Sequence, residues 1–137
     1  MAVGKLSAGL AAATILVAPT SNGESAPDSR QDLGLVRTVP SFDGIPITYE
    51  VHGRKSPTLV FVHGWSCDRR YWREQLEPFS HEYRVVAIDL AGHGDSGSGR
   101  QEPTIRSFGA DVAAVVRELG LERVVLIGHS MGGDVIM

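Results

Sequence analysis

Hydrophobic positions in this chain fall into short continuous runs, separated by longer segments of mixed polarity. Three runs are almost wholly apolar, at Thr58–Val62, Tyr83–Ile88 and Val124–Ile127. Runs of this length are typical of central strands that are covered on both faces. They therefore predict three buried strands of a parallel sheet.

Two further strands are predicted ahead of these runs, where hydrophobic and polar residues alternate. Val36–Phe42 and Ile45–Val51 flank Asp43-Gly44, a dipeptide that strongly favours a β-hairpin. In the second strand the apolar side chains occupy alternate positions. One face is therefore expected to be buried and the other, which carries Thr48, to be polar.

Two helices are predicted between the strands, at Arg70–Phe79 and Thr104–Leu119, where apolar residues recur at near-helical spacing. Thr104 can cap the start of the second helix, and Gly120 can end it. Strands that alternate with helices of this length predict an α/β fold. Its sheet is expected to be mostly parallel, with helices on both faces and an antiparallel hairpin at one edge.

The last buried run leads into a motif with the pattern G-x-S-x-G, made of Gly128, His129, Ser130, Met131 and Gly132 and followed by Gly133. A serine between a buried strand and a helix can occupy a strained turn that projects its hydroxyl above the sheet. Glycines two residues to either side avoid clashes in so sharp a turn, and Gly133 is expected to let the helix pack closely on the sheet. Ser130 is therefore predicted to be a nucleophile, at a helix N-terminus that favours negative charge.

A second loop follows the first buried run, at His63-Gly64-Trp65. In this position the backbone N–H of Trp65 can face the same pocket as the N–H of Met131. Two such donors would form an oxyanion hole for a tetrahedral intermediate. Alone, the His-Gly step would be interpreted as a plain strand-ending turn, but its combination with the serine motif favours the oxyanion interpretation.

A glycine-rich turn, Asp89–Ser96, follows the second buried run. A phosphate-binding loop is one interpretation, but the helix-start spacing of a dinucleotide site is missing. Asp89 and Ser96 are instead expected to hydrogen-bond backbone groups of the loop.

These three segments, in this order, resemble the α/β-hydrolase superfamily, over about Leu35–Met137. The resemblance implies the first five or so strands of an eight-stranded sheet, in the spatial order 1-2-4-3-5, with catalytic groups at the carboxyl ends of the strands. Because Ser130 stands at the nucleophile position in place of an aspartate, the resemblance argues against the haloalkane dehalogenase and epoxide hydrolase branches. It points to esterases, lipases, acyl-transfer peptidases, carbon–carbon bond hydrolases and perhydrolases.

Catalytic triads of this superfamily run along the chain in the order Ser, Asp or Glu, His. No histidine follows Ser130 in this sequence, so the acid and the base are expected beyond Met137, with any cap that selects the substrate. The chain is accordingly expected to be an amino-terminal portion of a longer enzyme, with little activity of its own. The following residues are not expected to serve as the acid or the base of the triad: His63, His93, His129, Asp89 and Asp134.

The leading functional hypothesis is a hydrolase of carboxylic esters or related acyl bonds, with an acyl-enzyme intermediate on Ser130 and a small-molecule acyl or ester substrate. One alternative is a carbon–carbon bond hydrolase or perhydrolase on the same fold. Another is a non-catalytic binding protein on a hydrolase scaffold.

Composition and charge constrain the partners. A formal net charge of -3 with interspersed signs gives no reason to expect a nucleic-acid partner. The single cysteine, Cys67, is interpreted as a small, partly buried residue and not as a second nucleophile. Neither a metal-binding cluster nor a nucleotide fingerprint appears in the sequence, so no metal and no cofactor are expected, and the oligomeric state is not predicted.

The first residues are typical of an export signal. The apolar run Leu6–Ala18 follows Lys5 and is shorter than the roughly 20 residues that a membrane span requires. We therefore divide the chain into a signal peptide at residues 1–23, a flexible linker at 24–34 and a hydrolase domain at 35–137. A secreted or periplasmic location is expected, with a cytoplasmic one if the leader is not used, and no stable membrane span is expected.

Overall fold

The structure is a computed structural model that describes residues 34–137. The predicted signal peptide and all of the predicted linker except Gly34 lie outside the described residues. In the described part of the chain, none of the helices is long and apolar enough to cross a membrane.

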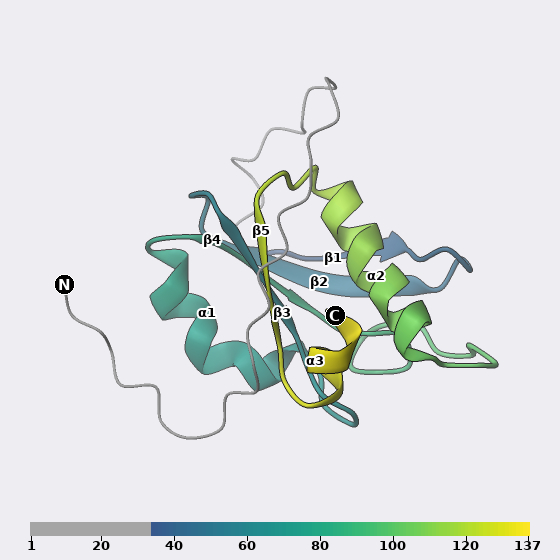
Figure 1. Cartoon of the computed structure of the whole chain (residues 1–137). Helices are drawn as coiled ribbons and strands as arrows, with labels where there is room; N and C mark the ends of the chain where they lie inside the picture. The colour runs from purple at the N-terminus through teal and green to yellow at the C-terminus, as the bar shows by residue number, and fades with distance from the viewer. Residues whose placement is uncertain (1–33) are drawn as a thin grey trace.

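A five-stranded mixed sheet forms the centre of the molecule (Figure 1). Its strands are β1 (Val36–Pro40), β2 (Pro46–His52), β3 (Thr58–Val62), β4 (Arg84–Ile88) and β5 (Val124–Gly128). They lie in the order β1-β2-β4-β3-β5. The β1–β2 and β2–β4 pairs are antiparallel, whereas β3 is parallel to both β4 and β5. The predicted strand order and the antiparallel hairpin at the edge are confirmed.

Helices cover both faces of this sheet, as predicted. They are the 3-10 helix η2 (Arg69–Trp72), α1 (Arg73–Ser80), α2 (Ile105–Glu118) and the short α3 (Met131–Val135). Figure 1 shows α1 on one side of the sheet and α2 and α3 on the other. Side chains alternate accordingly: Phe61 of β3 packs with Trp72 and Leu76, whereas its neighbour Val62 packs in the core that contains Phe108.

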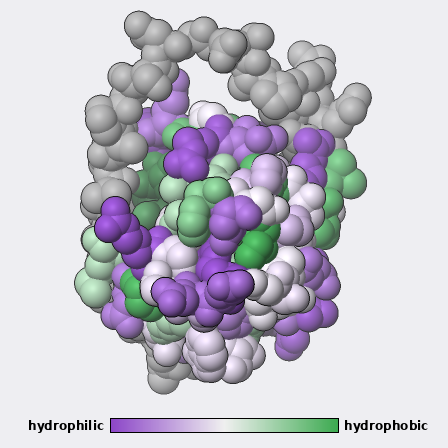
Figure 2. All heavy atoms as spheres, turned by 90° about the vertical axis from the view of Figure 1, so that its right-hand side faces the viewer, coloured by the Kyte–Doolittle hydropathy of each residue, from purple (hydrophilic) through white to green (hydrophobic). Residues whose placement is uncertain are grey.

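The side of the molecule on which α2 lies is shown in Figure 2, where hydrophilic and hydrophobic residues are interspersed.

Thr104 caps α2 as predicted, because its hydroxyl accepts from Ser107 N–H while the Ser107 hydroxyl accepts from Thr104 N–H. The left-handed φ of +56° at Gly120 follows the end of this helix, again as predicted.

Three details differ from the sequence expectations. The first hairpin strand ends at Pro40 and not at Phe42, because the turn already begins at Ser41, whose N–H donates to Ile45 O. The predicted helix at Arg70–Phe79 begins instead as a 3-10 turn whose N-terminus is capped by the Asp68 carboxylate.

The third difference concerns Thr48, which alternation placed on a polar outer face. Its exposed fraction is only 2%. The loop after β4 covers it: Thr48 N–H donates to Ser96 Oγ at 2.7 Å, and the Thr48 hydroxyl donates to Asp95 O at 2.9 Å. A long-range loop therefore buries a position that local alternation assigns to solvent.

Candidate active site

Ser130 occupies the sharp turn between β5 and α3. Its φ of 51° and ψ of -122° lie outside the regions that an L-residue normally adopts, and its side chain is exposed. Backbone strain of this kind costs on the order of 1–3 kcal/mol and persists where the surrounding structure imposes it. The turn thus holds the serine at the carboxyl end of the parallel strands with its hydroxyl accessible, as the sequence predicts.

Two glycines make this turn possible by allowing close backbone contacts. A Cβ on Gly128 would lie 2.3 Å from the Gly132 carbonyl oxygen. A Cβ on Gly132 would lie 2.3 Å from the Val62 carbonyl oxygen and 2.6 Å from that of His63. Both distances are far below van der Waals contact, so these two positions require glycine.

Gly133 does not have the role that the sequence predicts for it. Apart from its chain neighbours and the backbone of its own helix, no described atom lies within 4 Å of a Cβ built on this residue. The helix packs against the sheet through Gly132, one residue earlier, and the second glycine of the pair is open to substitution.

The loop after β3 lies directly against the serine turn. A Cβ on Gly64 would be 3.1 Å from Ser130 Cβ and 3.1 Å from the His129 carbonyl oxygen. The two turns are also joined by a hydrogen bond from His129 N–H to Val62 O, 3.0 Å long. The predicted His63-Gly64-Trp65 loop and the predicted nucleophile therefore meet at one place in the fold.

The two predicted oxyanion donors are Trp65 N–H and Met131 N–H. Within residues 34–137 neither group has a hydrogen-bond acceptor. Met131 is the first residue of α3, where N–H groups point out of the helix end and favour negative charge. Both N–H groups are therefore unpaired in the described part of the chain.

Sequence reasoning missed Ser66, which has a φ of 58°. It is the only residue besides Ser130, among the non-glycine residues that the structure describes, with a positive φ. Its strained conformation sits directly after the candidate donor Trp65, so each of the two loops of the site contains one strained serine. No sequence pattern distinguishes such a serine from one in an ordinary turn.

His63 is fully buried and has a structural role. Its Nδ1 lies 2.7 Å from the Gly64 carbonyl oxygen, and its Nε2 accepts from Leu90 N–H at 3.1 Å. These two bonds together require the neutral tautomer with the proton on Nδ1. Burial lowers the pKa of His63, against the opposing effect of the Gly64 carbonyl. Both ring nitrogens are occupied, so this histidine joins the loops after β3 and β4.

His129 precedes Ser130 but its ring is engaged elsewhere. It stacks on Tyr71 with a centroid distance of 4.4 Å and an interplanar angle of 24°. Among the described residues its Nδ1 is buried without a hydrogen-bond partner. The stack fixes the ring against η2, as a support for the turn.

The glycine-rich turn after β4 is built around Asp89, which is fully buried. The carboxylate accepts from the backbone N–H groups of Arg69 and Asp95 and forms an ion pair with the Arg69 guanidinium. Ser96 Oγ donates to Asp89 O at 2.7 Å. The predicted roles of Asp89 and Ser96 are therefore confirmed, while the partner Arg69, twenty residues away, was not foreseen.

A second ion cluster holds the far end of the same loop. Arg100 donates to both carboxylate oxygens of Asp111, at 2.8 and 3.0 Å, and also bonds Asp43 in the hairpin. Asp111 is fully buried and additionally accepts from the Ser41 hydroxyl and Ala91 N–H. These bonds raise the pKa of Arg100 and fasten the loop to the turn between β1 and β2 and to α2.

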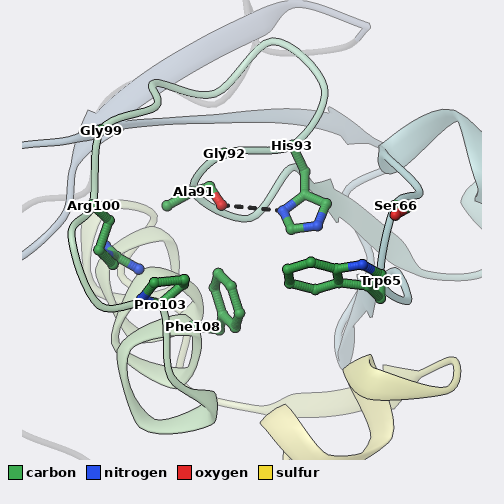
Figure 3. A pocket seen from close by; sticks show the side chains of 9 residues that line it. All are labelled: Trp65, Ser66, Ala91, Gly92, His93, Gly99, Arg100, Pro103 and Phe108. Atoms are coloured by element: carbon green, nitrogen blue, oxygen red, sulfur yellow. Dashed lines mark hydrogen bonds between the residues drawn. The ribbon is translucent and has the colours of Figure 1, made fainter.

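A pocket of about 240 Å³ opens beside these loops (Figure 3). Trp65, Pro103 and Phe108 form its apolar walls, and His93 lies over them.

Cys67, two residues from Trp65, is a partly buried free thiol. In the described part of the chain, no group of three His, Cys, Asp or Glu side chains could hold a metal ion.

Comparison with known proteins places this geometry in a family. A family model described as the alpha/beta hydrolase fold matches residues 57–137. A non-heme chloroperoxidase of Streptomyces lividans is 42% identical over 98 residues, which is 70% of this chain and 36% of that protein. A bifunctional esterase/perhydrolase of Acinetobacter calcoaceticus is 41% identical over 93 residues, 66% of this chain and 34% of that protein. Epoxide hydrolases also occur among the relatives.

The fold agrees with solved esterase structures. The esterase RhEst1 from Rhodococcus sp. ECU1013 superposes with a TM-score of 0.66 at 38% sequence identity, covering 74% of this chain and 38% of that one. The chain spans about a quarter to a third of the length of the curated relatives that it matches. The match over residues 57–137, together with the shared sheet and the strained serine turn, shows that this chain belongs to the α/β-hydrolase family.

Proposed function

We propose that the protein carrying this chain is an exported serine hydrolase that cleaves carboxylic esters or related acyl bonds of small molecules. The observation that carries the proposal is the juxtaposition of the strained Ser130 with two unoccupied N–H donors, those of Trp65 and Met131. The esterase relatives support the same reaction class.

In the proposed reaction, Ser130 Oγ attacks the substrate carbonyl carbon while its proton passes to a histidine of the whole protein. The carbonyl oxygen becomes an oxyanion and accepts from the N–H groups of Trp65 and Met131. Each such donor contributes about 3–4 kcal/mol to the stability of the transition state. The tetrahedral intermediate collapses, the alcohol leaves with the proton from the histidine, and water then releases the acid from Ser130.

The decisive test compares ester hydrolysis by the complete protein and by its Ser130→Ala variant. The variant is expected to lose on the order of 10⁶-fold in kcat, because the nucleophile is gone while the N–H donors remain. Ser98→Ala, at an exposed serine on the loop after β4, is the matched control and is expected to retain full activity. A Ser130→Ala variant that keeps its activity would reject the assignment.

One alternative is favoured by the bifunctional esterase/perhydrolase relative. A perhydrolase uses the same acyl-enzyme but transfers the acyl group to hydrogen peroxide. Peracid formation from an ester or carboxylate and hydrogen peroxide measures this activity, and it should also depend on Ser130. Absence of both activities in the complete protein would favour a non-catalytic binding protein.

Export rests on the leader at residues 1–23, outside the described part of the chain. If the leader is used, the mature protein found outside the cytoplasm should begin near residue 24. Amino-terminal sequencing of the secreted or periplasmic protein checks this point, and an intact Met1 in a cytoplasmic protein would contradict it.

A further inference from the structure

His93 is a polar group of the site that the proposed reaction does not use. It extends from the loop after β4, between Gly92 and Gly94, into the pocket that Trp65 and Phe108 line (Figure 3). Its ring contacts three other rings, with centroid distances of 5.0 Å to His63, 5.3 Å to Trp65 and 5.9 Å to Phe108. Packing on three sides fixes the position of the imidazole.

The hydrogen bonding of His93 also fixes its chemistry. Its Nδ1 lies 3.1 Å from the Ala91 carbonyl oxygen, drawn as the dashed line in Figure 3. Because a carbonyl can only accept, Nδ1 carries the proton, and the neutral ring presents Nε2 as an acceptor. Among the described residues, Nε2 has no hydrogen-bond partner, and it is not fully buried. It therefore keeps some solvent exposure on a residue that lines the pocket.

Two other polar side chains line the pocket, Ser66 and Arg100, and Arg100 is already engaged. All three of its guanidinium nitrogens donate to Asp111 or Asp43, and its side chain is only 7% exposed. The remaining walls at Trp65 and Phe108 are aromatic. A ligand group that can donate a hydrogen bond therefore finds two side-chain acceptors in this pocket, the Ser66 hydroxyl and His93 Nε2, and only the latter is an aromatic nitrogen.

The pocket is connected to the nucleophile through Trp65. The ring of Trp65 forms a wall of the pocket, while Gly64, the residue before it, lies against Ser130. An ester carbonyl held by Trp65 N–H would thus place a neighbouring part of the substrate beside the Trp65 ring, which His93 contacts.

We propose that His93 is a specificity-determining residue that accepts a hydrogen bond from the acyl part of the substrate, so that the site favours acyl groups with a hydroxyl near the carbonyl over purely alkyl ones. This inference rests on the proposed function for the position of the carbonyl. A neutral hydrogen bond makes a net difference of about 3- to 10-fold in binding, which sets the size of the expected preference.

The test uses two matched pairs in which a hydroxyl replaces a methyl group. The first pair is the p-nitrophenyl esters of 3-hydroxybutanoate and 3-methylbutanoate, compared by kcat/KM with the complete protein. The second is the unreactive ketones 4-hydroxy-2-pentanone and 4-methyl-2-pentanone, whose dissociation constants are measured by NMR titration. Each pair is measured on the wild type, on His93→Phe and on the control Ser98→Ala.

The wild type and Ser98→Ala are expected to prefer the hydroxylated member about 3- to 10-fold in both pairs. His93→Phe keeps an aromatic ring in place but lacks the acceptor, so its preference for the hydroxylated member should disappear in both pairs. Equal affinity for the two ketones in the wild type, no binding of either, or an unchanged preference in His93→Phe would overturn the inference. If the ketone preference depends on His93 but neither ester is hydrolysed, the inference stands and the proposed function fails.

Discussion

At the residue scale, the backbone around Ser130 depends on the absence of side chains at particular glycines. Gly128 and Gly132 each have a carbonyl oxygen 2.3 Å from where a Cβ would be, whereas Gly133 has open space. These three residues lie within six positions of one another. Replacing each by alanine therefore compares the effect of an added methyl group at two crowded positions and one open position.

We predict that Gly128→Ala and Gly132→Ala each lower the free energy of unfolding by about 1–3 kcal/mol, because the added methyl group forces backbone atoms apart. Both variants should also lose ester hydrolysis, since the turn that presents Ser130 is displaced. Urea unfolding and an ester assay measure the two effects. Gly133→Ala is the control and should match the wild type in both; a loss there equal to that of Gly132→Ala would contradict the steric account.

The buried His63 makes stability depend on pH. Because its folded pKa lies below the ordinary value of 6.5, the unfolded chain binds more protons as the pH falls below that value. The stabilisation is therefore complete above about pH 6.5 and is lost as the pH falls toward the folded pKa. The slope from one such group is at most about 1.4 kcal/mol per pH unit.

We predict that His63→Asn removes this component of the pH dependence. Urea unfolding between pH 7.5 and pH 5 should give the wild type a steeper loss of stability than the variant, whatever the variant's absolute stability at pH 7.5. Asparagine retains a donor for the Gly64 carbonyl but does not titrate. Parallel pH profiles for the two proteins would show that His63 is not the group responsible.

At the scale of elements, two ion clusters fasten the loop after β4. Arg69 and Asp89 bind its start to η2, and Arg100 and Asp111 bind its end to α2 and the hairpin. The side chains of Asp89 and Asp111 are fully buried. A loop held at both ends in this way gives His93 and Trp65 a fixed relative position.

We predict that Asp111→Ala destabilises the protein by about 3–5 kcal/mol, because it leaves the Arg100 charge buried beside too few acceptors. Glu74→Ala breaks the exposed Arg73–Glu74 pair, in which both side chains are 76% exposed, and serves as the control. Exposed pairs contribute about 0–1 kcal/mol, so this variant should remain close to the wild type. Similar losses in the two variants, measured by urea unfolding, would contradict the assigned role of the cluster.

Several elements were predictable from the sequence because the information that specifies them is local. The buried runs, the cap at Thr104 and the turn at Ser130 each depend on neighbouring residues, and the structure confirms them. The burial of Thr48, the pairing of Asp89 with Arg69 and the partners of Asp111 depend on residues 11 to 70 positions away. Neither alternation nor motif spacing carries that information, which is why these contacts were missed.

At the scale of the whole molecule, β5 lies at one edge of the sheet and, within residues 34–137, pairs only with β3. Its residues Val125, Leu126 and Ile127 are only partly buried. An apolar strand with a free edge is a template for pairing with another strand.

We predict that the 137-residue chain, when expressed by itself, self-associates through β5. Size-exclusion chromatography should show oligomers whose proportion rises with protein concentration. A chain that stays monomeric up to about millimolar concentration, the upper end of the range in which such edges associate, would contradict this prediction.

Covalent labelling tests most directly whether Ser130 is the nucleophile. The complete protein should be treated with a fluorophosphonate, and the modified peptide identified by mass spectrometry. We predict a single phosphonyl adduct on Ser130 and no labelling of the Ser130→Ala variant. An adduct on another residue, or equal labelling of that variant, would contradict the claim.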